Sequence, residues 1–165
     1  MTLIHTMAQY ATLWAIADYM EQKYISKKPK QDWHKSFRMV TVGAFVIAPL
    51  VYGWVRVAER ISPGNQLRNV LKKVFIGQTI FAPFAISTFY ASTSLLEGKS
   101  VEQFKSEWSE KFPATYTNNL KVWPAVQIVN FSYVPLIHRP KVMGCVSFIW
   151  SMYLCFQKED AYAEV

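Results

Sequence analysis

Charged side chains and cysteines are both scarce in this sequence. Asp, Glu, Lys and Arg make up 18% of its 165 residues, whereas typical soluble domains contain about 25%. Cys145 and Cys155 are the only cysteines, and no C-x-x-C motif is present to bind zinc or carry redox chemistry. These absences exclude a small disulfide-stapled fold and a zinc-finger protein, so the two thiols are best explained as packing residues.

The sequence also lacks every common catalytic or cofactor motif. His5, His34 and His138 do not have the paired spacing of metal ligands. No G-x-S-x-G elbow, P-loop or dinucleotide fingerprint occurs, and no pair of acids suggests general acid–base catalysis. No basic stripe with interleaved aromatics lies on a polar face. We therefore predict a protein that is not an enzyme, has no catalytic or metal-binding residues and no cofactor, and binds no nucleic acid directly.

Long uncharged stretches are what the sequence has in abundance. Residues 74–96 form a run of 23 without a charge, and 39–55, 122–137 and 142–157 form runs of 17, 16 and 16. At about 1.5 Å per helical residue the first run can cross the ~30 Å hydrocarbon core of a bilayer. The shorter runs lie near the spanning minimum, which keeps a soluble helical bundle as the alternative. The net charge of +7 comes from basic residues that flank the runs, which favours a membrane protein.

We expect an all-α fold: a polytopic membrane helix bundle of four to five embedded helices plus one amphipathic interfacial helix. The interfacial helix is indicated by Val101, Phe104, Trp108 and Phe112, which recur at helical spacing with polar residues between them. Packing of this helix on a soluble core is the alternative. A single integral membrane domain over 1–165 is expected to contain helices at about 3–24, 32–60, 66–97, 101–118 (interfacial), 120–134 and 141–157.

Two prolines interrupt the last apolar region. Pro135 and Pro140 leave open whether 120–157 forms two embedded helices or one kinked helix. Pro49 and Pro83 lie inside the second and third helices, where each frees a backbone carbonyl and kinks its helix. The expected partners are the lipid bilayer, a small solute and further copies of the chain.

Six polar or charged side chains fall within or beside the apolar runs. They are expected to turn inward, because an unpaired amide or carboxylate that faces lipid is costly. In one interpretation they hydrogen-bond across helices, each contributing ~0.6–2 kcal/mol. In the other they line a hydrated path for a small solute. The candidates are Asp18, Gln22, Arg38, Gln78, Gln127 and Asn130.

One segment carries a long signature. "VWPAVQIVNFSYVPLIHR" (residues 122–139) resembles the W-P-x-x-Q-x-x-N-F-x-x-V-P-x-x-x-R pattern of the Mpv-seventeen family, which includes the twenty-two-kilodalton peroxisomal membrane protein. "ADYMEQ" (17–22), "ERISPG" (59–64), "LKKVFIGQTIFAPF" (71–84) and "IWSMYLCF" (149–156) are similar to further family motifs in the same order. "AISTFYASTSLLEGKS" is most similar to the Mpv-seventeen-like branch.

The resemblance implies a small multi-helix protein of the mitochondrial inner membrane, with the peroxisomal membrane as the alternative. It links the chain to reactive-oxygen metabolism, mitochondrial DNA maintenance and weakly selective channels, with no enzyme activity. The family's D-Q before F-x-P is Gly77-Gln78 here, so one buried carboxylate is missing. Trp123 is expected to anchor at the membrane interface and Pro124 to lie in a first helical turn. The signature residues expected to have structural roles are Trp123, Pro124, Phe131, Pro135, Arg139 and Trp150.

Overall fold

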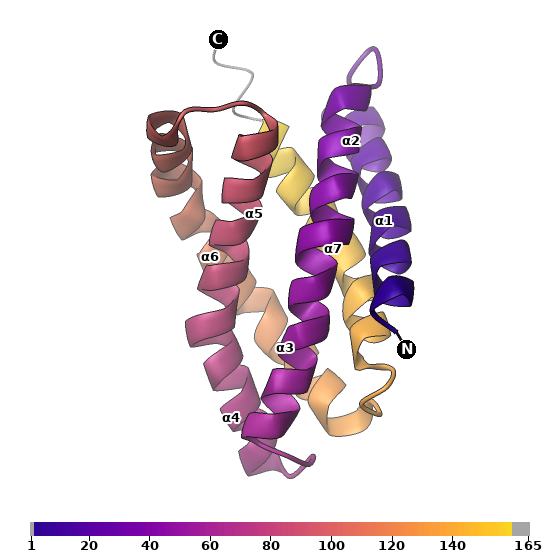
Figure 1. The fold of residues 1–165 in the computed structure, drawn as a ribbon, viewed down its shortest axis with the longest axis vertical. Coiled ribbons are helices and arrows are strands. Elements are labelled where there is room, and N and C mark those ends of the chain that lie inside the picture. Colours follow the sequence, from indigo (N-terminus) through magenta and orange to yellow (C-terminus); the bar gives the residue numbers. More distant parts are fainter. Residues whose placement is uncertain (1, 160–165) are drawn as a thin grey trace.

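The secondary structure of the described residues is entirely helical, which confirms the expected all-α class. The computed structural model describes residues 2–159, which form five helical rods along the long axis of the molecule (Figure 1). Three rods contain a five-residue π turn, in which backbone hydrogen bonds reach one residue further back than in an α-helix. The elements are α1 (Leu3–Met20), η1 (Glu21–Ile25), α2 (Trp33–Val42), η2 (Gly43–Ile47), α3 (Ala48–Ile61), α4 (Leu67–Ile76), η3 (Gly77–Phe81), α5 (Ala82–Leu96), α6 (Val101–Tyr133) and α7 (Arg139–Glu159).

Capping residues and glycines separate the rods. Asp32 caps α2 by accepting a hydrogen bond from the Lys35 backbone N–H at 2.9 Å, and Ser100 opens α6 with a capping box. Gly64 and Gly98 have φ angles of 87° and 70°, in the left-handed region that glycine adopts without a steric penalty. Local sequence therefore decides where each rod stops.

Helix α6 differs from the two helices expected at 101–118 and 120–134. It runs unbroken from Val101 to Tyr133. The Nδ2 atoms of Asn118 and Asn119 donate to Tyr153 and Gln78 of neighbouring helices, at 3.0 and 2.7 Å, so these residues do not end the helix. Pro124 lies inside α6 and not in a first turn, because an interior proline removes one backbone hydrogen bond without stopping a well-packed helix. The chain instead turns at 134–138, which separates α6 from α7.

The segment 101–118 turns its aromatic face towards the protein, not towards lipid as expected. Phe104, Trp108 and Phe112 pack against the main core. The Trp108 indole N–H also donates to Ser87 Oγ on α5 at 3.0 Å. Because α5 and α6 pack together, a neighbouring helix covers the face that sequence periodicity alone could not assign to protein or membrane.

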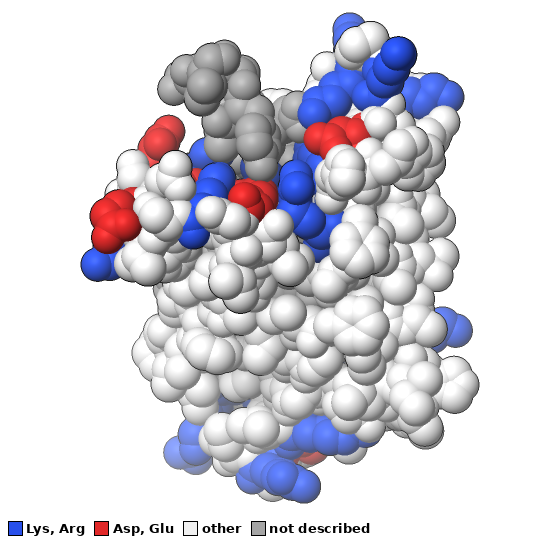
Figure 2. All heavy atoms as spheres, turned by 45° about the horizontal axis from the view of Figure 1, so that its top comes forward, with Lys and Arg blue, Asp and Glu red and all other residues white. Residues whose placement is uncertain are grey.

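The outer surface of the bundle is apolar around its waist. Phe45, Ile80 and Ile149 lie on three different rods and are 66%, 65% and 68% exposed. Figure 2 shows charged side chains gathered mainly at the two ends, with a largely uncharged band between them. The rods Trp33–Ile61 and Leu67–Leu96 are long and apolar enough to span a membrane. Exposed apolar area on this scale marks a surface that contacts something other than water.

Charged groups at the ends of the rods are paired inside the protein. Lys35 lies 2.7 Å from Glu21, and Lys73 lies 2.6 Å from Glu59. In both pairs the partners are 14 residues apart and join two successive rods across a turn. Removing one partner of such a pair leaves a buried charge and costs about 3–5 kcal/mol.

The turn between α5 and α6 is closed by a larger network. Lys158 from α7 lies 3.0 Å from Glu97 and 2.6 Å from Glu107, and Lys99 lies 2.9 Å from each of the same two glutamates. Burial alone lowers the pKa of Lys99, but its hydrogen bonds to Glu107 and Glu97 outweigh burial and raise that pKa above its usual value. The network ties the end of α7 to the α5–α6 turn.

Candidate functional site

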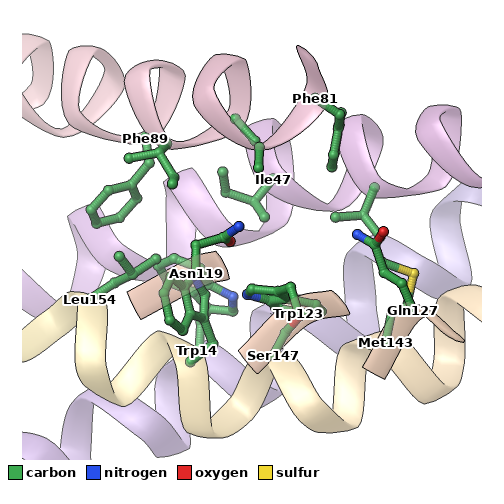
Figure 3. Close-up of a pocket in the computed structure, with 15 residues that line it drawn as sticks. Trp14, Ile47, Phe81, Phe89, Asn119, Trp123, Gln127, Met143, Ser147 and Leu154 are labelled. Atoms are coloured by element: carbon green, nitrogen blue, oxygen red, sulfur yellow. The ribbon is translucent and has the colours of Figure 1, made fainter. Parts of the chain in front are cut away.

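A cavity of about 70 Å³ lies in the centre of the bundle. All five rods contribute to its wall, and none of the described residues that line it is charged. Figure 3 shows Trp14, Asn119, Trp123 and Gln127 around this cavity. The remaining wall is made by Ile47, Val51, Phe81, Ala82, Ala85, Ile86, Phe89, Met143, Ser147, Trp150 and Leu154.

Two polar atoms of cavity-lining side chains are buried without a partner among residues 2–159. These are Oε1 of Gln127, an acceptor, and Nε1 of Trp14, a donor. A buried polar atom without a hydrogen bond costs about 1–3 kcal/mol. A cavity holds a water molecule once it offers about 10–15 Å³. This wall therefore suits a small neutral molecule that both donates and accepts hydrogen bonds.

The two π turns η2 and η3 flank the cavity. Each begins at a glycine and is followed by Ala-Pro, which gives the pattern G-x-x-x-x-A-P at 43–49 and again at 77–83. The backbone N–H of Ala48 reaches Gly43 O, and that of Ala82 reaches Gly77 O. A proline clashes with the carbonyl four residues before it, and widening the preceding turn relieves this clash. Such π turns are frequent at functional sites.

Both glycines allow a close approach of a cavity residue. A Cβ added at Gly43 would lie 2.5 Å from ring carbons of Trp14. A Cβ at Gly77 would lie 2.9 Å from Gln127 Oε1 and 3.0 Å from Trp54 Cζ2. At Gly77 the space that a side chain would fill is therefore taken by the neutral amide of Gln127.

Gln78 reaches the cavity through Asn119. Asn119 Nδ2 donates to Gln78 Oε1 at 2.7 Å, and the Tyr116 hydroxyl donates to the Gln78 backbone carbonyl at 2.9 Å. Sequence reasoning missed Asn119, because it fell in the break expected between the helices 101–118 and 120–134. The pair of G-x-x-x-x-A-P patterns is the sequence feature that could have located this level of the bundle.

The other predicted polar residues lie elsewhere. Asp18 is buried near the end of α1 and Gln22 is buried in η1, and Gln22 Nε2 donates to Asp18 Oδ2 at 2.8 Å. Asn130 is buried near the opposite end and donates to the Arg139 backbone carbonyl at 3.5 Å. Arg38 is half-buried on α2 and is not part of the cavity wall. The structure therefore distributes the six candidates over three levels and places only Gln127 on the cavity itself.

The signature residues divide between the cavity and the α6–α7 turn. Trp123 is 8% exposed and packs edge-on against Trp150, with ring centroids 6.1 Å apart. It is therefore a wall of the cavity and not an interface anchor, because α6 turns this face inward.

At the α6–α7 turn, which contains Pro135, Arg139 makes three contacts. It pairs with Glu59, and it donates from Nε to Val134 O at 2.9 Å and from Nη2 to Phe131 O at 3.1 Å. Phe131 is fully buried beneath the guanidinium.

A helical bundle with an apolar waist, charges paired at its ends and a neutral cavity in its centre is typical of an α-helical membrane protein. Comparison with known proteins gives the family. The sequence profile described as "Mpv17 / PMP22 family" matches residues 94–155. The chain is 34% identical over 151 residues to the Mpv17-like protein of Bos taurus, covering 92% of this chain and 75% of that protein.

Two further relatives agree. The Mpv17-like protein of Xenopus laevis is 35% identical over 158 residues, covering 94% of this chain and 76% of that protein. The mitochondrial inner membrane protein Mpv17 of Homo sapiens is 31% identical over 148 residues, covering 88% of this chain and 84% of that protein. No solved structure matches the chain. The chain belongs to the Mpv17 / PMP22 family, and the names of its relatives place it in the mitochondrial inner membrane.

Proposed function

We propose that this protein permits or regulates the passage of small solutes across the mitochondrial inner membrane, without catalysis and without a cofactor. The observation that carries the proposal is the central cavity, whose wall combines contributions from all five rods with unpaired polar atoms on Gln127 and Trp14. Intramembrane polar groups that face a cavity are typical of solute pathways. The two flanking π turns add support, because such turns are frequent at functional sites.

The proposal includes four to five embedded helices. Its support is that large apolar side chains are exposed on every rod, including Ile16 on α1, Val129 on α6 and Ile149 on α7. Such side chains face lipid readily and water only at a cost. In the first half of α6, Glu107 and Lys111 are buried. Glu102, Lys105 and Glu110 are exposed, and these charges suit the membrane boundary better than its centre.

The uncharged wall indicates which solutes suit the path. A cation or anion in the cavity would meet no opposite charge, and an unpaired charge in a low-dielectric site is strongly disfavoured. A neutral hydrogen-bonding molecule such as hydrogen peroxide suits the unpaired donor and acceptor. Passage of such a molecule would connect the protein to reactive-oxygen metabolism and mitochondrial homeostasis.

A non-conducting membrane scaffold is the second candidate function. It is favoured by the paired charges that close both ends of the bundle, at Glu97, Glu107 and Lys158 on one side and at Glu59, Lys73 and Arg139 on the other. In that case the amides serve packing alone.

Flux through liposomes distinguishes the two functions. Purified protein is reconstituted, and entry of hydrogen peroxide and of a small cation is measured with encapsulated reporters. We expect peroxide entry above that of empty liposomes, and a severalfold reduction for Gln127→Leu. Val129→Leu, a change on the exposed face of the same helix, is the matched control. Absence of flux, or flux unchanged in folded Gln127→Leu protein, would contradict solute passage through this cavity and favour the scaffold.

A further inference from the structure

Two adjoining hollows lie where α1 and α2 meet at the end of the bundle. The first, about 260 Å³, is lined by Gln22, Lys23, Lys28, Pro29 and Lys30 together with Tyr19 and Gln31. The second, about 380 Å³, is lined by Ala15, Trp33, Ser36, Phe37 and Val40 together with the same Tyr19 and Gln31. The shared residues show that a basic hollow continues directly into an apolar groove.

The basic hollow is suited to a phosphate group. Three lysines line it, and residues 18–38 contain six Lys or Arg against three Asp or Glu. One of those acids, Glu21, is already paired with Lys35 inside the protein. Figure 2 shows Lys and Arg crowding this corner of the molecule. Lys23 and Lys30 are exposed and Lys28 is half-buried, so positive charge reaches the surface here, where an anionic headgroup can meet it.

The groove beneath is suited to an acyl chain. Trp33 and Phe37 are 73% and 72% exposed, and Tyr19 is 44% exposed on the facing helix. Tryptophan and tyrosine concentrate at the membrane–water boundary, where one end of the ring is apolar and the other is wet. The groove thus lies at the depth where a lipid changes from headgroup to chain.

The buried network around Asp18 holds the junction of the two hollows in place. Ser36 Oγ donates to Asp18 Oδ2 at 2.5 Å, and Gln31 Nε2 donates to Ser36 Oγ at 2.8 Å. Gln22 also accepts from the Asp32 backbone N–H at 2.7 Å through Oε1. These contacts fix Gln31, which borders both hollows. The polar cluster around Asp18, which takes no part in the central cavity, therefore has a structural role at this junction.

We infer that this junction is a binding site for one anionic phospholipid, with its phosphate among Lys23, Lys28 and Lys30 and an acyl chain between α1 and α2. The charge selects an anionic over a zwitterionic headgroup, and the apolar groove selects a lipid over a free phosphate. The site is separate from the central cavity, so it does not depend on solute passage.

Native mass spectrometry of the purified chain in detergent tests the site, with phosphatidylglycerol and phosphatidylcholine as probes. We expect phosphatidylglycerol to remain bound at concentrations where phosphatidylcholine does not. The variant K23Q/K28Q/K30Q should bind phosphatidylglycerol at least about tenfold more weakly, since each lysine near an anionic surface contributes roughly a fivefold factor. K72Q/K105Q/K121Q removes the same charge from exposed lysines elsewhere and should bind normally.

The groove is tested separately. Ala15→Trp fills it from an exposed position, whereas Thr12→Trp places the same ring on the same helix outside it. Only Ala15→Trp should weaken lipid binding, with helicity and thermal stability unchanged in both. Equal binding of the two lipids, equal loss in the two lysine triples, or competition by inorganic phosphate at concentrations similar to the lipid would each overturn the inference.

Discussion

The rods α2–η2–α3 and α4–η3–α5 share the pattern G-x-x-x-x-A-P, yet their π turns face different surroundings. Gly43 opens η2 against the indole of Trp14, and Gly77 opens η3 against the amide of Gln127. Next to Gly77 stands Gln78, bonded to Asn119, whereas the residue after Gly43 is Ala44. The comparison shows that proline and glycine decide where a helix widens. Side chains within the turn and from other rods together decide whether the widened turn is apolar or polar.

The largest expected effect is at the apolar turn. Gly43→Ala should lower the free energy of unfolding by about 3 kcal/mol, because the added methyl would overlap a buried ring that cannot move aside. Gly53→Ala is the control: no atom lies within 4 Å of the added methyl, so replacing this helix glycine should raise stability by ~0.5–1 kcal/mol. Denaturation in detergent, followed by circular dichroism, measures both. Equal changes in stability for the two variants would show that Trp14 does not restrict the space for a side chain at residue 43.

The next effect is at the polar turn. Asn119→Leu should cost about 2 kcal/mol, because it leaves Gln78 Oε1 buried without its partner. Adding Gln78→Leu to that variant should restore part of the loss, since both polar partners are then absent. The loss of stability caused by Gln78→Leu is measured twice, in the original protein and in the Asn119→Leu variant. Equal losses would show that the two amides are not coupled.

Gly77→Ala should have a smaller effect than Gly43→Ala, about 1 kcal/mol, because the nearest atom is the end of a flexible side chain. Its effect on solute flux should be larger than that of Gly43→Ala, since Gln127 must move within the cavity. Unfolding and liposome flux are measured on the same two preparations. If the Gly77→Ala protein is less stable than the Gly43→Ala protein, the polar turn is the more tightly packed of the two, contrary to this prediction.

The smallest expected change in stability belongs to Gln127→Leu. The Gln127 amide oxygen is buried without a partner. Replacing this side chain by an apolar one of similar size should therefore change the free energy of unfolding by less than about 1 kcal/mol. A loss of more than that would assign Gln127 to helix packing. Thermal unfolding in detergent gives the answer independently of any flux.

Much of the fold could be predicted from the sequence, and the candidate site only in part. Uncharged runs and the helical spacing of apolar residues indicated an all-helical chain, and these features act within a few residues of one another. The break expected near 118–120 was wrong, because Asn118 and Asn119 bond to other rods. Gln127 was predicted to face inward and does line the cavity. Asp18 and Asn130 were also predicted to face inward because they are polar residues beside apolar runs, but they lie at opposite ends of the bundle.

The sequence by itself determined the helical class, most helix ends and the positions where proline forces a turn to widen. These follow from backbone geometry and from hydrogen bonds between near neighbours. Only the tertiary structure decided that Trp123 faces a cavity, that Gly77 makes room for Gln127, and that a basic turn sits above an apolar groove. Each of these joins residues from different rods, and periodicity along one helix specifies which face is apolar but not what covers that face.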